Sequence, residues 1–141
     1  MPKAPKPTHK QCRAMFDAAH AAGVLAAEEA TPTPMLVQQH ASPLDDSSPV
    51  TKQWEVPEGP CGFAMVLIRP ATSRFANWLK KNGHAQYSDY YKAVLFFING
   101  YGQSHTRKKA FAGAFARELQ QRLAEYENSE NMTIQPRAWL D

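Results

Sequence analysis

Residues 62–68 read GFAMVLI, a continuously apolar and β-prone run that begins at a glycine and ends before Arg69. Because no polar residue alternates with the apolar ones, the run predicts a central strand with both faces covered. Residues 73–83 read SRFANWLKKNG and predict a helix, since Thr72 or Ser73 can cap it, apolar residues recur at steps of three and four, and lysines and a glycine mark its end.

The same order of strand and helix repeats further along the chain. Residues 92–101 contain AVLFFI and predict a second strand, and a long amphipathic helix is predicted to follow from Ser104 or Thr106. Residues 132–140 predict a last strand, which Pro136 places at an edge of the sheet.

The number of strands depends on residues 84–87, a polar segment just before Lys92. If this segment pairs, the core is an α+β ferredoxin-like βαββαβ sandwich with helices on one face of an antiparallel sheet. If it does not pair, the core is a three-stranded βαβαβ sheet with right-handed crossovers. The first arrangement is preferred, because the segment before Lys92 is rich in tyrosine and contains a two-residue turn.

Composition divides the chain into four segments. Residues 1–8 are rich in proline and lysine and are expected to form a mobile basic arm, and residues 9–34 predict an alanine-rich helix capped by Thr8. Residues 35–60 contain several prolines and the acidic turn LDDSS, so a long Pro-rich acidic loop is expected, with an edge strand only at its start. Residues 61–141 are the predicted α+β core domain.

Length and composition exclude several classes of protein. The chain has 141 residues, 43% of them hydrophobic, which suffices for one core and not for two domains. No apolar run approaches the roughly 20 residues that span a bilayer, and residues 1–7 lack the apolar part of a secretory signal, so a cytoplasmic protein is expected. Cys12 and Cys61 are expected to be reduced. His9 and Cys12 have a ligand-like spacing but no second such pair exists, so no metal is expected.

Charge is distributed unevenly along the chain, although the net charge is only +3. Residues 1–16 carry +4, residues 17–58 carry −6, residues 59–117 carry +8 and residues 118–141 carry −3. The basic excess therefore lies in the predicted core. It indicates either an anionic partner or an attraction between basic and acidic parts of the same chain.

The strongest candidate site is the strand-to-helix segment 99–109, which reads NGYGQSHTRKK. Amides at a helix start attract anions, and cations in a first helical turn oppose the helix dipole unless an anion lies there. The alternative is a solvated basic helix start. The glycines match neither a dinucleotide fingerprint nor a P-loop, so no cofactor is expected. The candidate anion-binding residues of this segment are Gln103, Ser104, His105, Arg107 and Lys108.

A similar turn, RPATSR at residues 69–74, adds Arg69 and Arg74 to the candidate anion-binding residues. Strand order, which the sequence leaves open, decides whether the two turns meet. If they share one end of the sheet, their cations converge on one polyanionic ligand. If they lie at opposite ends, the basic surface is diffuse and better suited to a nucleic-acid backbone.

Aromatic residues are interleaved with these cations, an arrangement that proteins use to stack nucleobases. The RNP aromatic pattern of RNA-binding ferredoxin-like domains is absent. Phe96 and Phe97 are therefore interpreted as core and sheet-face residues.

Enzymatic activity is not expected. Ser104 and His105 are adjacent and cannot easily form a nucleophile–base pair with each other, and no glycine-flanked serine elbow is present. Asp89 is the only carboxylate in the basic segment, and a turn position explains it.

Several motifs are distinctive when they are read together: TPTPM at residues 31–35, LDD at 44–46, CGFA at 61–64, FANWLKKNG at 75–83, GQS at 102–104 and AFA at 114–116. They resemble those of a group of small proteins encoded by bacteriophages and mobile plasmids. The resemblance extends from about residue 11 to the C-terminus. It implies a genomic setting and no particular activity.

The expected function is that of a small non-enzymatic accessory protein of a phage or mobile element. It would bind a phosphate-bearing ligand, either a nucleotide or a nucleic acid, through a basic face at helix N-termini. The alternative is a protein–protein interaction module that inhibits or recruits a host protein, in host takeover or counter-defence. Both would act in the host cytoplasm, and both are compatible with an oligomer.

Overall fold

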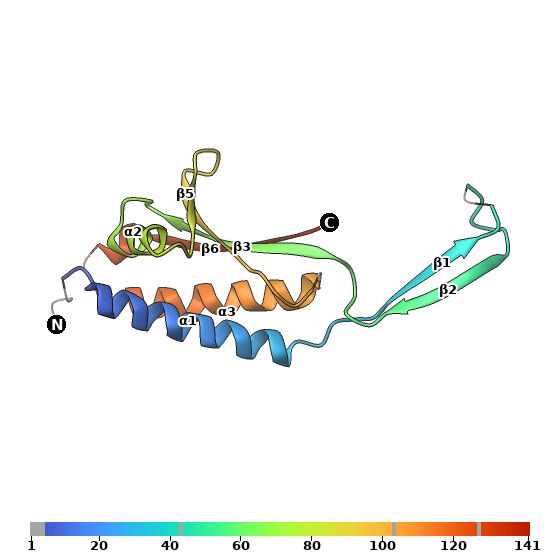
Figure 1. Cartoon of the computed structure of the whole chain (residues 1–141), viewed down its shortest axis with the longest axis horizontal. Coiled ribbons are helices and arrows are strands. Elements are labelled where there is room, and N and C mark those ends of the chain that lie inside the picture. Colours follow the sequence, from blue (N-terminus) through green and yellow to red (C-terminus); the bar gives the residue numbers. More distant parts are fainter. Residues whose placement is uncertain (1–4, 43, 103, 127) are drawn as a thin grey trace.

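The computed structural model describes residues 5–42, 44–102, 104–126 and 128–141, in which three α-helices, one short 3-10 helix and six strands form an α+β fold (Figure 1). The elements in chain order are α1 (His9–Glu29), β1 (Met35–His40), β2 (Val50–Val56), β3 (Gly62–Arg69), α2 (Arg74–Lys81), β4 (Gln86–Ser88), β5 (Ala93–Phe97), α3 (His105–Leu123), the 3-10 helix Ser129–Asn131 and β6 (Thr133–Leu140).

The main sheet has four strands in the order β4-β5-β3-β6, and every neighbouring pair is antiparallel. The apolar run at residues 62–68 lies in the central strand β3, as the sequence predicts, because β5 and β6 pair with its two edges. The prediction that both faces are covered was wrong, since helices cover one face and Phe63 on the other is 39% exposed. The predicted strand before Lys92 is present as β4, so the three-stranded alternative was wrong. Pro136 lies in the edge strand β6, where its missing N–H removes no ladder bond from the sheet interior.

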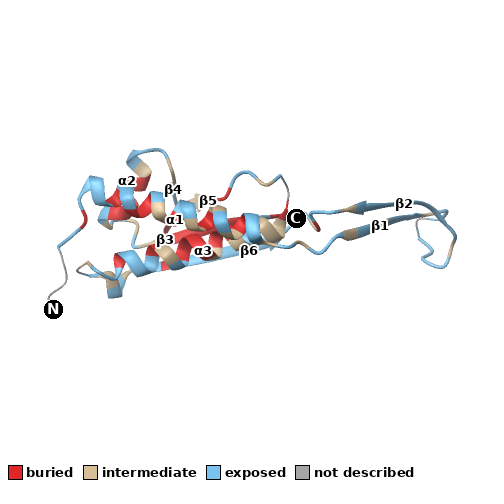
Figure 2. Cartoon of the chain, turned by 90° about the horizontal axis from the view of Figure 1, so that it is seen from below, coloured by how far each residue is buried: buried red, intermediate tan, exposed pale blue. Residues whose placement is uncertain are grey.

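All three helices bury their apolar residues against one face of this sheet (Figures 1 and 2). We call this face the inner face. It carries Val66 and Ile68, and Phe115 of α3 is completely buried between the helices and the sheet, stacked on Phe96 at 4.6 Å. Gly23 lies in the interior of α1 where close packing requires a glycine, since a Cβ atom there would lie 2.7 Å from the Phe111 ring.

The helix starts follow from the predicted caps. Thr8 forms a capping box with Gln11 at the start of α1, and Ser73 accepts a hydrogen bond from the Ala76 amide at the start of α2. Pro7 is already buried, so any mobile arm ends before it, and residues 1–4 of the predicted arm lie outside the described residues. No helix in the described part of the chain has the length and hydrophobicity that a membrane crossing requires.

Residues 35–56, which we call the hairpin, differ from the predicted loop. Strands β1 and β2 pair in an antiparallel ladder and project beyond the rest of the molecule, and their residues are exposed or half-buried (Figures 1 and 2). The prolines mislead the prediction because Pro49 and Pro57 flank β2 and do not interrupt it. We call the described remainder, residues 5–30 and 61–141 with their gaps, the body.

Candidate functional site

The two strand-to-helix turns lie at opposite ends of β3. Helix α2 follows the C-terminal end of β3, whereas the first residue of α3, His105, donates its amide to Pro60 just before the N-terminal end of β3, at 3.2 Å. This separation follows from the antiparallel pairing of β3 with β5. Eight residues of strand span roughly 23 Å, so the predicted anion-binding residues form two groups and do not converge.

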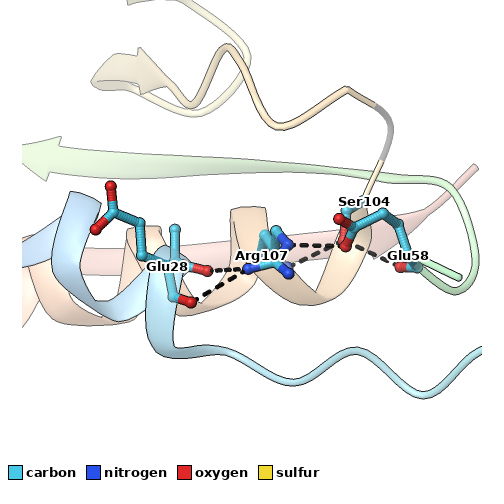
Figure 3. Close-up of polar contacts among 5 residues, drawn as sticks. Glu28, Glu58, Ser104 and Arg107 are labelled. Atoms are coloured by element: carbon cyan, nitrogen blue, oxygen red, sulfur yellow. Dashed lines mark hydrogen bonds and ion pairs between the residues drawn. The ribbon is translucent and has the colours of Figure 1, made fainter.

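In the first group, Ser104 holds the connection between the hairpin and the body (Figure 3). Its side chain caps α3 by accepting from the Arg107 amide at 3.3 Å, and its hydroxyl donates to the backbone oxygen of Glu58 at 3.1 Å. Ser104 is 2% exposed. The serine is therefore a structural residue that ties the end of the hairpin to the start of α3.

Arg107 uses its charge within the chain (Figure 3). Its Nε lies 2.7 Å from the Glu58 carboxylate, and its Nη1 donates to the carbonyl of Ala27 at 2.6 Å and to that of Glu28 at 3.5 Å. The last turn of α1 contains no basic residue of its own, so Arg107 supplies the cation that the carbonyl end of a helix favours. We call the group of Glu58, Ser104 and Arg107 the root of the hairpin.

The other residues of this group are also engaged within the chain. A Cβ atom added at Gly62 would lie 2.6 Å from the His105 side chain, so these two residues pack tightly. Lys108 is 7% exposed, and its ammonium lies 5.5 Å from the centre of the Phe63 ring in a cation–π arrangement. Gln103 lies outside the described residues.

In the second group, the two arginines have different surroundings. Arg69 donates from Nε and Nη2 to the carbonyl of Tyr91, at 3.2 and 2.8 Å. Arg74 makes a 3.4 Å bond to the carbonyl of Pro7 and is otherwise exposed beside a pocket of about 250 Å³ that Lys6 and Ser73 also line. Anion binding by Arg74 stays a prediction.

The face of the sheet opposite the helices, which we call the outer face, combines aromatic and basic residues. The ladder registers place Phe63 opposite Trp139 and Met65 opposite Phe97 and Arg137, and side chains that alternate along each strand point to the same side. Phe63, Phe97 and Trp139, which we call the aromatic cluster, are each 38–39% exposed, and the rings of Phe63 and Trp139 are 5.7 Å apart.

The charged residues within the strands of the outer face are basic, and Asp141, whose amide donates to the Cys61 carbonyl at 3.0 Å, follows β6 at the end of the ladder. Arg69 and Arg137 are the charged residues of its strands, since none of the strand residues that the registers place there is acidic. Arg137 lies 5.4 Å from the centre of the Tyr91 ring, and Lys108 adds a third cation beside Phe63. The sheet therefore presents flat aromatic rings bordered by cations.

Of the residues on and beside the outer face, the sequence analysis named Lys108 and Arg69 as anion-binding candidates but not Phe63, Trp139 and Arg137. Each of these lies in a strand of the predicted core, and the alternation along β3 and β6 is visible in the sequence. The missing information was the register, because only the pairing of Phe63 with Trp139 brings the two rings together.

Both cysteines are free thiols, and burial raises the pKa of the Cys12 thiol to about 11, although Arg74 opposes the shift. Within the described residues, no three His, Cys, Asp or Glu side chains gather where they could hold a metal ion.

Comparison of the chain with protein families, with curated proteins and with solved structures gave no match.

Proposed function

We propose that this protein binds single-stranded nucleic acid on the outer face of its sheet. The observation that carries the proposal is the aromatic cluster of Phe63, Phe97 and Trp139, exposed on a sheet face bordered by cations. Bases of any sequence stack on exposed aromatic rings, and cations nearby attract the phosphates. The phosphate-bearing ligand expected from the sequence is retained, but its site moves from the helix N-termini to the sheet.

The geometry favours a single strand over a duplex. Stacking needs bases whose faces are accessible, and the bases of a duplex are stacked on each other. The Phe63 and Trp139 rings are adjacent and tilted by 30° to each other, so neighbouring bases of an unpaired strand can contact them in turn. Electrostatic attraction alone would not distinguish the two forms.

We also propose that the body has a ferredoxin-like fold. The support is its element order β3-α2-β4-β5-α3-β6 together with the antiparallel strand order β4-β5-β3-β6, which leaves one sheet face without helices. In this arrangement α1 is an additional helix in the helical layer, where it packs against α3.

The biological setting is part of the same proposal. The protein acts as a non-enzymatic accessory factor of a phage or mobile plasmid in the host cytoplasm. Its support is the resemblance of the motifs in residues 62–119, and the structural roles of Ser104 and His105 fit a protein without a catalytic serine. The expected partner is nucleic acid that becomes single-stranded during replication or transfer of such an element.

The test is fluorescence anisotropy with a labelled oligothymidylate of about ten nucleotides, a length within the usual site size for one stacking domain. We expect binding that weakens with added salt and is stronger than binding to a duplex of equal length. Trp139→Ala and Phe63→Ala should each reduce the affinity by about tenfold, because one stacked base contributes about 1–3 kcal/mol.

Trp54→Ala is the matched control, since Trp54 is as exposed as Trp139 but lies in the hairpin. It should not reduce the affinity. Circular dichroism and the melting temperature of each variant establish that the body remains folded. Equal affinity of the Trp139 variant and the wild type would refute the proposed site, and preference for the duplex would refute the proposed ligand.

A further inference from the structure

The hairpin has an apolar face that the body does not cover. Its register pairs Met35 with Val56 and Val37 with Trp54, so these four side chains share one face. Trp54 is 44% exposed, and Leu44 near the tip is 99% exposed. An isolated two-stranded hairpin is marginally stable in water, so this one gains stability from any surface that covers its apolar face.

The root directs the hairpin away from its own body. Ser104 and Arg107 hold the backbone and the carboxylate of Glu58, and the Gly59 amide donates to the carbonyl of Val56 at 3.0 Å. Gly59 has a φ of +76° and packs against the carbonyl of Thr33, which a Cβ atom would approach to 2.7 Å. Because the exit of the hairpin is fixed in this way, the hairpin projects beyond the body (Figure 1).

The charges of the hairpin and of the outer face indicate which surface the hairpin can contact. The hairpin carries Asp45, Asp46 and Glu55 against Lys52, a net charge of −2. The Ser47 hydroxyl and amide donate to Asp45 and hold the pKa of its carboxyl below its usual range. The outer face has the opposite charge and exposes the aromatic cluster. The acid residues that can meet this basic face are Asp45 and Asp46 at the tip, because Glu55 lies on the opposite side of the ladder and Lys52 covers the Trp54 ring at 5.5 Å. The acidic tip therefore matches the side of the outer face that carries Arg137.

We propose that the hairpin of one copy of this chain lies across the outer face of a second copy. Hairpin and aromatic cluster lie at the same end of the body, because only five residues separate the end of β2 from the start of β3, with Phe63 as its second residue. A two-fold axis then lets each copy give its hairpin to the other, so that the contact is made twice and closes as a dimer. This contact does not depend on nucleic-acid binding, although both use the outer face.

The experiment is sedimentation equilibrium of the full chain over a range of protein concentrations, without nucleic acid. We expect a reversible monomer–dimer equilibrium that shifts toward the monomer in high salt. A chain that stays monomeric at every concentration and at low salt overturns the proposal. So does a dimer whose dissociation constant is independent of salt.

Two charge-reversed chains locate the contact. One carries Asp45→Lys and Asp46→Lys at the hairpin tip, and the other carries Arg137→Glu on the outer face. Each should raise the dimer dissociation constant by about tenfold or more, because like charges then oppose each other. Asp17→Lys on the exposed side of α1 is the control and should leave the constant unchanged.

Mixing the two charge-reversed chains gives the sharpest result. One of the two hairpin contacts in the mixed dimer then joins a reversed hairpin to a reversed face, so the mixture should associate more strongly than either variant alone. Absence of this recovery, or a dimer that only the Arg137→Glu change weakens, overturns the proposal. A dimer that neither change weakens uses another surface and overturns it as well.

Discussion

The body and the hairpin are stabilised by different means. In the body, residues from α1, α2, α3 and the sheet form one buried cluster, and Phe115 has no exposed surface. In the hairpin, none of the described residues is buried, and the strands are held by their own ladder and by the root. The difference teaches that burial fixes the body, whereas the hairpin depends on backbone hydrogen bonds and on its root.

Truncation of one aromatic residue in each region should give the largest contrast. Phe115→Ala should lower the free energy of unfolding by about 3–5 kcal/mol, because it leaves a cavity beside Phe96. Trp54→Ala in the hairpin should change it by about 0.5 kcal/mol or less. Urea denaturation at low protein concentration measures both, and similar losses would mean that the hairpin is part of the core.

Loss of Arg107 should disturb both regions at their junction. Arg107→Ala removes the ion pair with Glu58 and the bonds to the end of α1, and it should cost about 1–3 kcal/mol. Hydrogen exchange of the Gly59 and His105 amides should accelerate. The control is Arg122→Ala, whose exposed pair with Glu118 is worth about 0.5 kcal/mol or less. If the two changes lowered the free energy of unfolding equally, the root would contribute no more than an exposed ion pair.

Replacement of two glycines in the body by alanine should change the free energy of unfolding in opposite directions. Gly23→Ala places a methyl group against the Phe111 ring, so overpacking exceeds the gain in helix propensity and the net loss is about 1 kcal/mol. Gly113→Ala in α3 meets no atom within 4 Å and should stabilise by about 0.5–1 kcal/mol. Thermal denaturation distinguishes the two, and stabilisation by Gly23→Ala would mean that α1 packs more loosely than described.

The smallest expected effect is a difference in reactivity between the two cysteine thiols. Cys61 is exposed where the hairpin meets the body, and Cys12 is buried with a pKa raised to about 11. Because Cys61 is exposed, it should react quickly with a disulfide reagent, whereas Cys12 should react only on unfolding. If both thiols reacted quickly, α1 would have to separate readily from the rest of the body.

Much of the body could be predicted from the sequence because its signals are local. The apolar run of β3, the capping serine of α2 and the basic last turn of α2 are all visible within a few residues. Strand β2 was missed although Val50, Trp54 and Val56 are spaced by even numbers of residues with polar residues between them. The prolines of this segment suggested a loop. In addition, β2 pairs only with β1 and is exposed, so it lacks the long apolar run that marks a buried strand.

The roles of the basic residues could not be predicted, because their partners are distant in sequence. Arg107 binds the Ala27 carbonyl, 80 residues away, and nothing near Arg107 in the sequence indicates this. The two strand-to-helix turns look alike in sequence, and only the antiparallel strand order separates them. The outer face likewise depends on the register between β3 and β6.

The connectivity of the hairpin has a consequence for proteolysis. Strand β1 continues from α1, whereas β2 leads into β3, so the two strands belong to different halves of the chain. A protease that cuts at the exposed Leu44-Asp45 bond would produce two fragments, one with α1 and the other with the complete four-stranded sheet. The β1–β2 ladder and the packing of α1 on α3 would keep the fragments together. The nicked protein should therefore elute as one species in native chromatography and separate into two only under denaturing conditions.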